Sequence, residues 1–186
     1  MLVPPIELEA RDGRRMRLRA LTPSDAAAWR AHAVEWLGHM PYIIMAPDEL
    51  PDLAAQKRML EQLDPARGDL LCGLFDLSAG AEQIVGDIWL TPGARRKTRH
   101  VATLAMSLRP DVQGVGLGRA MLEHAIAWAQ QHPEIERIHL SAMRDNHAAL
   151  ALYRSTGFTE EAHRAQAYRQ PDGSYQDEVL MSREVR

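Results

Sequence analysis

Residues 112–122 read VQGVGLGRAML, with three glycines at alternate positions directly before an apolar stretch. The preceding residues 100–108, HVATLAMSL, predict a strand, and the apolar residues from Leu117 to Pro133 recur at i, i+3 and i+4, which predicts a helix. A glycine-rich turn between a strand and a helix lets backbone N–H groups face an anion at the positive end of the helix. The stretch therefore indicates an anion-binding loop, or a turn that only packs the helix tightly.

Two familiar nucleotide-binding loops do not fit this spacing. A dinucleotide fingerprint needs G-x-G-x-x-G and an acidic residue at the end of the next strand, whereas this loop reads G-x-G-x-G and Glu136 opens the next strand. A P-loop needs Lys-Ser or Lys-Thr after its last glycine, where this chain has Arg119-Ala120. Neither a dinucleotide nor a nucleoside triphosphate is expected here.

Two segments together resemble one family. The pattern Gln113-x-x-Gly116-x-Gly118 resembles the acetyl-CoA loop of the GNAT superfamily of N-acetyltransferases, and residues 146–158, NHAALALYRSTGF, resemble that family's Asn…Tyr…Gly-Phe segment. The two signatures cover residues 104–158. The resemblance implies an α/β (α+β) fold, the acyl-CoA N-acyltransferase fold, with a central, mostly antiparallel sheet flanked by about four helices.

The resemblance also implies where acetyl-CoA binds. The backbone N–H groups of the glycine loop would hold the pyrophosphate, and they belong to Gln113, Gly114, Val115, Gly116, Leu117, Gly118 and Arg119. At the end of the preceding strand, Met106, Ser107 and Leu108 would pair through their backbone with the pantetheine arm. One of their N–H groups would polarise the thioester carbonyl.

Asn146 and Tyr153 are the side chains that the resemblance singles out on the later helix. Asn146 would contact the cofactor arm, and Tyr153 would protonate the departing thiolate. Their separation corresponds to about two helical turns, so they share a face. Asn146 is equally suited to be a helix N-cap, and Tyr153 to be an ordinary core aromatic.

The proton acceptor for the incoming amine is open. Many members of the family carry a carboxylate on the strand before the loop, but residues 100–108 contain none. Asp87, His100 and a chain of water molecules are the candidates. Asp87 could equally be a hydrogen-bonded strand residue, and His100 a residue at the edge of a turn.

The expected reaction is direct attack of a free primary amine on the thioester. The acceptor is expected to be a small molecule such as an amino acid, with the apolar loop 41–47, PYIIMAP, near its site. Carboxylates around that loop would suit a polyamine if they are not simply solvated. Acetylation of a protein N-terminus or a lysine is the alternative activity, and a non-catalytic acyl-CoA sensor is the alternative of another class.

Composition narrows the partners. The 186 residues predict one domain over 1–186, with 46% hydrophobic and 25% charged residues and a net charge of −3. This balance argues against nucleic acid or an anionic membrane as a partner, and the basic run 94–100 is expected to be a solvated turn. The single cysteine, Cys72, is expected to be a buried thiol. A cytoplasmic enzyme without a metal is expected, and a homodimer is common in the family.

The remaining elements follow from period and turn residues. A helix is expected over 22–36 and directs Ala27, Ala28, Ala31 and Val34 to the core. Other helices are expected over 52–64 and 146–155. Strands are expected over 16–21, 69–77, 83–90, 135–143, 160–170 and 174–184, with 69–77 and 83–90 joined as a hairpin by the turn 78–82 and the last two joined by the turn Pro171-Asp172-Gly173.

Overall fold

The computed structural model describes residues 4–78, 80 and 82–186. Its strands are β1 (Ile6–Glu9), β2 (Arg15–Ala20), β3 (Leu70–Asp76), β4 (Gln83–Pro92), β5 (Val101–Leu108), β6 (Arg137–Met143), β7 (Thr159–Arg169) and β8 (Tyr175–Glu184). Its helices are α1 (Ala26–Trp36), α2 (Leu53–Glu61), α3 (Leu117–Gln131) and α4 (His147–Ser155). Short 3-10 turns occupy Pro23–Asp25, Leu37–His39, Pro47–Glu49 and Pro110–Val112.

The strands form one sheet in the order β1-β2-β3-β4-β5-β6-β8-β7. Among the described strands only β5 and β6 run parallel, so the predicted mostly antiparallel sheet is confirmed. The predicted hairpins are β3–β4 and β7–β8. The turn expected over 78–82 includes Ala79 and Ala81, which lie outside the described residues. β1 was not predicted, because its four residues give too short an alternation of apolar and polar side chains.

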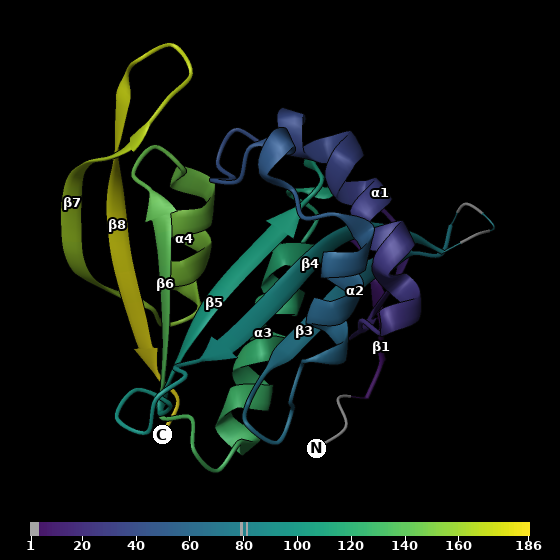
Figure 1. Ribbon diagram of the computed structural model, residues 1–186, viewed down its shortest axis with the longest axis horizontal. Coiled ribbons are helices and arrows are strands. Elements are labelled where there is room, and N and C mark those ends of the chain that lie inside the picture. The colour runs from purple at the N-terminus through teal and green to yellow at the C-terminus, as the bar shows by residue number, and fades with distance from the viewer. Residues whose placement is uncertain (1–3, 79, 81) are drawn as a thin grey trace.

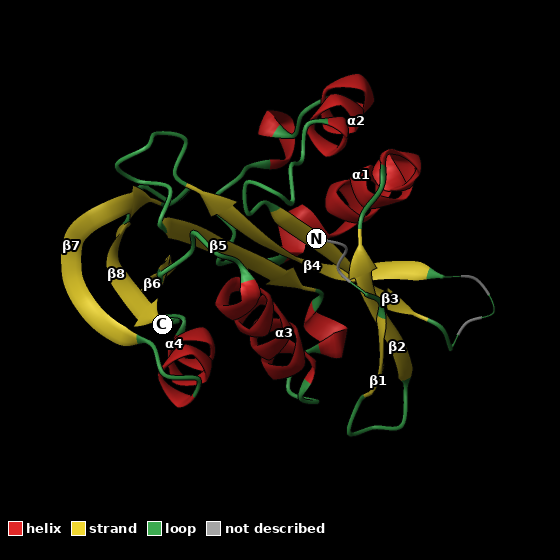
Figure 2. Ribbon diagram, turned by 90° about the horizontal axis from the view of Figure 1, so that it is seen from below, coloured by secondary structure: helices red, strands yellow, loops and turns green. Residues whose placement is uncertain are grey.

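The helices cover the two faces of the sheet unequally. α3 and α4 lie on one face, while α1 and α2 lie on the other, over the β2–β4 half (Figures 1 and 2). As predicted, α3 buries Met121, Ala125 and Trp128 in the main core. Cys72 is fully buried, as predicted, and burial raises the pKa of its thiol to about 12. The α3 side therefore holds most of the core, and the α1 side is left more open near β6, β8 and β7.

The predicted core face of α1 was wrong. The residues expected to point inward are exposed, and they are Ala27, Ala28, Ala31 and Val34. The helix instead buries Ala26, Trp29 and His32. Alanine has little apolar surface to lose to water, whereas Trp29 buries a large ring and gains a hydrogen bond from its indole N–H to Asp87 at 2.7 Å. Burying Trp29 therefore stabilises the fold more than burying the alanines would, and the Trp29 side of α1 faces the sheet.

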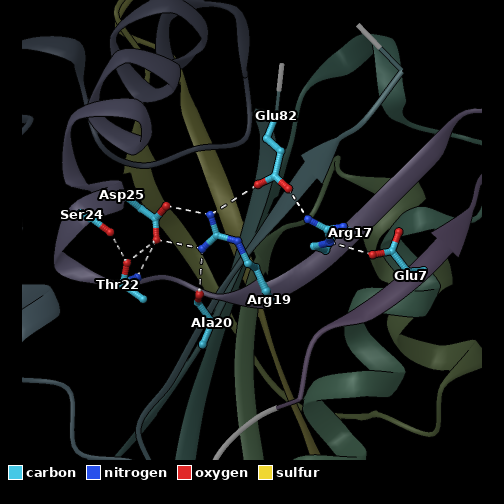
Figure 3. Close-up of polar contacts among 8 residues, drawn as sticks. All are labelled: Glu7, Arg17, Arg19, Ala20, Thr22, Ser24, Asp25 and Glu82. Atoms are coloured by element: carbon cyan, nitrogen blue, oxygen red, sulfur yellow. Dashed lines mark hydrogen bonds and ion pairs between the residues drawn. The ribbon is translucent and has the colours of Figure 1, made fainter. Parts of the chain in front are cut away.

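Ion pairs fix the position at which α1 begins (Figure 3). The Arg19 guanidinium on β2 donates to both carboxylate oxygens of Asp25, each at 2.8 Å. The backbone N–H and the hydroxyl of Thr22 also donate to Asp25, at 2.8 and 2.7 Å. Glu82 extends the network to Arg17. Asp25 directly precedes α1, so this network holds the helix in register with the sheet.

We expect the Asp25 network to make folding stability depend on acidity. The Arg19 hydrogen bond is the main cause that lowers the pKa of Asp25 from 3.8 to about 2, and hydrogen bonds from Thr22 add to it. A lowered carboxyl pKa stabilises the fold above pH 4, and this stabilisation is lost as pH falls from about 4 to about 2. At pH 7, Asp25→Asn should lose about 1–2 kcal/mol in urea unfolding, after allowing for partial solvent screening.

The control is Asp48→Asn, which changes an exposed residue of a neighbouring loop. It should unfold like the wild type at every pH. A difference between wild type and Asp25→Asn that stays constant from pH 5 to pH 2 would contradict the assignment.

Candidate functional site

β5 and β6 begin side by side and separate toward their C-terminal ends. Residues 101–103 of β5 pair with 137–139 of β6, whereas 104–108 have no strand partner on that edge among the described strands. Figure 1 shows the two strands diverging. The open edge of β5 can therefore pair with an extended ligand, as it would with another strand.

The hydrogen bonds to β4 decide which backbone groups of β5 remain free. The N–H of Arg109 donates to the carbonyl of Val85 at 2.9 Å. Because direction alternates along an antiparallel strand, the N–H and C=O of Ser107 also point toward β4. Those of Met106 and Leu108 point to the open edge. Of the three residues predicted to pair with a ligand, only Met106 and Leu108 have N–H groups directed there.

The glycine loop presents a run of free donors. The backbone N–H groups of residues 114–119 have no acceptor among the described residues, and no side chain caps α3. The first N–H in this run to make a helical hydrogen bond is that of Ala120, which donates to the carbonyl of Gly116 at 3.2 Å. Gly114 and Gly116 have φ of 76° and 94°, in the left-handed region that favours glycine. Free N–H groups at the positive end of a helix form an anion site.

Gln113 and Gly118 fasten this loop to its surroundings. The Gln113 side-chain amide donates to the carbonyl of Leu108 at 2.9 Å, and its backbone N–H donates to Pro110 at 3.3 Å. A Cβ on Gly118 would lie 3.3 Å from Leu108 and 3.4 Å from Leu152 of α4. Gln113 is thus an anchor of the loop, and its N–H is not among the free donors. The loop, the end of β5 and α4 meet at Gly118.

Arg119 and Asn146 border the same region. The Arg119 guanidinium donates to Ser155 on α4 at 2.6 Å and pairs with Glu123 at 3.3 Å. Asn146 caps α4, since its side-chain oxygen accepts from the N–H of Ala149 at 3.1 Å. The N-cap interpretation of Asn146 is therefore confirmed. Its amide nitrogen has no partner in the described part of the chain and remains available to a ligand.

Tyr153 is a buried residue of α4. The residue is 7% exposed, and its ring packs against Phe158 with the ring centroids 5.9 Å apart. The hydroxyl makes no hydrogen bond to any residue that the structure describes. Burial raises the pKa of the phenol to about 12. The side chain is therefore a core aromatic with a protonated hydroxyl that is free to donate.

Asp87 lies on the α1 side of the sheet, beside Ser107. Its two carboxylate oxygens accept from the Ser107 hydroxyl at 2.8 Å and from the Trp29 indole N–H at 2.7 Å. The interpretation of Asp87 as a hydrogen-bonded strand residue is confirmed. His100 precedes β5, and its carbonyl accepts from the N–H groups of residues 136 and 137. At about 3.3 Å per residue it lies roughly 25 Å from the far end of β5, too far to act there.

The segment between α1 and α2 reaches the C-terminal end of β6, where β6 and β5 have separated. The Tyr42 hydroxyl donates to the carbonyl of Asp145, between β6 and α4, at 3.2 Å. Ile44 and Met45 are 66% and 42% exposed. The segment therefore carries exposed apolar side chains and is held to the residues that follow β6.

Known proteins resemble the chain at the levels of sequence and fold. The model of the acetyltransferase (GNAT) family matches residues 25–158. The [ribosomal protein bS18]-alanine N-acetyltransferase of Escherichia coli K12 is 38% identical over 77 residues, which are 41% of this chain and 51% of that enzyme. The chain thus spans about half the length of the curated relatives of this type.

Solved structures match over nearly the whole chain. An acetyltransferase of the GNAT family from Streptococcus pneumoniae superposes with a TM-score of 0.84 at 25% identity and covers 91% of this chain and 99% of its own. A putative acetyltransferase from Salmonella typhimurium, solved with its cofactor acetyl-CoA, gives a TM-score of 0.77 at 20% identity, over 92% and 94% of the two chains. No described helix is long and apolar enough to cross a membrane. The described residues include no cluster of three or more potential metal ligands.

Proposed function

The chain belongs to the acetyltransferase (GNAT) family, and we propose that it transfers the acetyl group of acetyl-CoA to a primary amine. The observation that carries the proposal is the run of free N–H groups at residues 114–119, next to the open edge of β5. A pyrophosphate has only acceptor oxygens and negative charge, so it complements this run. An added Cβ at Gly114 would meet nothing within 4 Å, which leaves space for a ligand.

The other groups of the site suit the remainder of acetyl-CoA, which supplies an activated acetyl thioester. The N–H groups of Met106 and Leu108 would hold the pantetheine arm, and one would hydrogen-bond the thioester oxygen. A donor of this kind typically contributes about 2.7–4 kcal/mol to transition-state stabilisation. Asn146 would donate its free amide N–H to the arm. Tyr153 would donate its hydroxyl to the sulfur.

Ser107 has a different proposed role from the one expected. Its backbone is directed to β4, and its hydroxyl donates to Asp87 at 2.8 Å. It would therefore hold Asp87 in place on the acceptor side. The Asp87 carboxylate gives that side a negative charge, which would attract a substrate ammonium.

The proposed acceptor is a small molecule with a primary amine, such as an amino acid. The N-terminal amine of a protein is the second candidate, because of the similarity to the bS18-alanine N-acetyltransferase. The exposed side chains of Tyr42, Ile44 and Met45 offer apolar surface for part of either acceptor.

An acceptor panel tests the proposed function. We expect the wild-type chain to release CoA from acetyl-CoA with free amino acids, and to release it more slowly with polyamines. Release with free-N-terminal peptides but not with amino acids would favour the second candidate. If no amine in the panel caused release of CoA although the chain bound acetyl-CoA tightly, the result would contradict a transferase and favour an acyl-CoA sensor.

A further inference from the structure

The buried face of α1 carries three aromatic side chains in line with the end of β5. Trp29, His32 and Trp36 recur at i, i+3 and i+7, so they share one side of the helix. Trp29 is fixed to β4 by its hydrogen bond to Asp87. Arg109 directly follows β5, and its guanidinium carbon lies 4.6 Å from the centroid of the Trp36 ring. His32 lies between these two anchors along the helix, on the face of α1 that packs against β4 and the residue after β5.

The His32 ring makes no hydrogen bond to any residue that the structure describes. The residue is 7% exposed, and its Nδ1 is buried without a partner among the described residues. The Trp36 indole N–H, on the same face, is also buried and has no partner in the described part of the chain. An unsatisfied buried polar atom destabilises the fold, and such atoms in native proteins call for a functional explanation or a bound water.

Charged groups on three elements affect the pKa of His32. They are Asp87 of β4, Arg109 and Asp111 of the segment after β5, and Glu35 of α1 itself. Burial lowers the pKa of His32 most, and the positive charge of Arg109 lowers it further. The three carboxylates raise it, but they do not restore the ordinary value. At neutral pH the imidazole is therefore uncharged and able to accept a proton.

We propose that His32 accepts the proton that the acceptor ammonium must lose before it attacks the thioester. This inference rests on the proposed acetyl transfer. His32 has an unused nitrogen, whereas both oxygens of Asp87 already accept hydrogen bonds. Asp87 would then attract the ammonium, and His32 would remove its proton.

A histidine base also limits the class of amine that the site should accept. The α-amine of a peptide N-terminus has an ordinary pKa of about 7.7–8.0, and a lysine amine one of about 10.4. A histidine base is matched much more closely to the α-amine. The site should therefore prefer an α-amine, as in an amino acid or an N-terminus, over a lysine or a polyamine.

The protons balance as follows. His32 takes one proton from the ammonium and later passes it to solvent. The nitrogen lone pair forms the new bond to the carbonyl carbon, and the C–S bond breaks with its electron pair on sulfur. The nitrogen loses a second proton as the amide forms. This second proton replaces the one that the Tyr153 hydroxyl gives to the sulfur. The products are the N-acetylated amine and CoA with a free thiol.

The test compares His32→Gln with the wild type across pH, using an amino acid acceptor and acetyl-CoA. We expect kcat/KM to be about 100-fold lower at pH 7, with acetyl-CoA affinity unchanged. At pH 9.5 a much larger fraction of the α-amine is deprotonated than at pH 7, so the deficit should shrink about tenfold. The wild type should lose activity only as pH falls below the ordinary histidine pKa of about 6.5.

His124→Gln is the matched control. His124 lies on α3, across the sheet. Its Nε2 is buried without a partner among the residues that the structure describes, and burial lowers its pKa. It should keep the wild-type rate and pH profile. A deficit of His32→Gln that is equal at pH 7 and pH 9.5, or no deficit, would overturn the role of His32, because a packing defect has no such pH dependence. His32→Asn should repeat the His32→Gln profile. A wild type without activity on any amine would overturn the proposed function itself.

Discussion

Tyr153→Phe is expected to lower kcat for acetyl transfer by about 100- to 10,000-fold, the usual contribution of a general acid. The hydroxyl makes no hydrogen bond within the described part of the protein, and the ring packs against Phe158. Phenylalanine keeps that packing, so folding stability and acetyl-CoA affinity should stay near the wild-type values. The measurements are steady-state kinetics and calorimetric titration with acetyl-CoA.

The raised pKa of Tyr153 shapes this expectation. A phenol with a pKa of about 12 is protonated throughout the working pH range. Its pKa lies well above that of a thiol, about 8.5, so the proton should move only as the breaking C–S bond builds charge on sulfur. Tyr175→Phe, at a 54% exposed position, is the control and should not change kcat. Wild-type turnover by Tyr153→Phe would show that another group, or water, protonates the thiolate.

Gly116→Val is expected to weaken acetyl-CoA binding by about 100-fold or more. Gly116 has a φ of 94°, which a β-branched residue adopts only with strain, so the loop should change shape and redirect its N–H groups. Losing two charge-assisted hydrogen bonds at about 1.5 kcal/mol each would account for this change in affinity. A Cβ at this position would lie 3.6 Å from Arg11, an ordinary contact, so a steric clash is not the cause.

Gly173→Val separates backbone strain from the binding effect. Gly173 has a φ of 86° in the turn between β7 and β8, with open space around its Cα. Both variants should lose folding stability, by about 1–3 kcal/mol. Only Gly116→Val should lose affinity in calorimetric titration. Equal affinity of the two variants for acetyl-CoA would remove the glycine loop from the binding site.

Local spacing in the sequence predicted the parts of the site that lie close together in the chain. The strand before the loop, the glycines and the helix after them form one continuous segment, so their order sets their geometry. Asn146 as an N-cap follows from the same local logic. The outcome for Ser107 needed the structure, because the pairing of β4 with β5 decides which way its N–H points.

The proposed acceptor side could not be predicted in the same way. The residues proposed for it come from α1, β4 and the end of β5, which the fold brings together from distant parts of the chain. The alanines of α1 suggested the wrong core face, so Trp29 and His32 were not predicted to face the sheet. The spacing of Trp29, His32 and Trp36 was a signal available in the sequence. The separation of β5 from β6 depends on long-range pairing and left no local signal.

The transfer assay on the wild-type chain tests the central claim most directly. The chain is incubated with isotope-labelled acetyl-CoA and an amino acid, and the products are identified by mass spectrometry. We predict labelled N-acetyl amino acid and free CoA in equal amounts, formed only when both substrates are present. Tight binding of acetyl-CoA with no labelled product from any amine, amino acid or peptide would contradict the account.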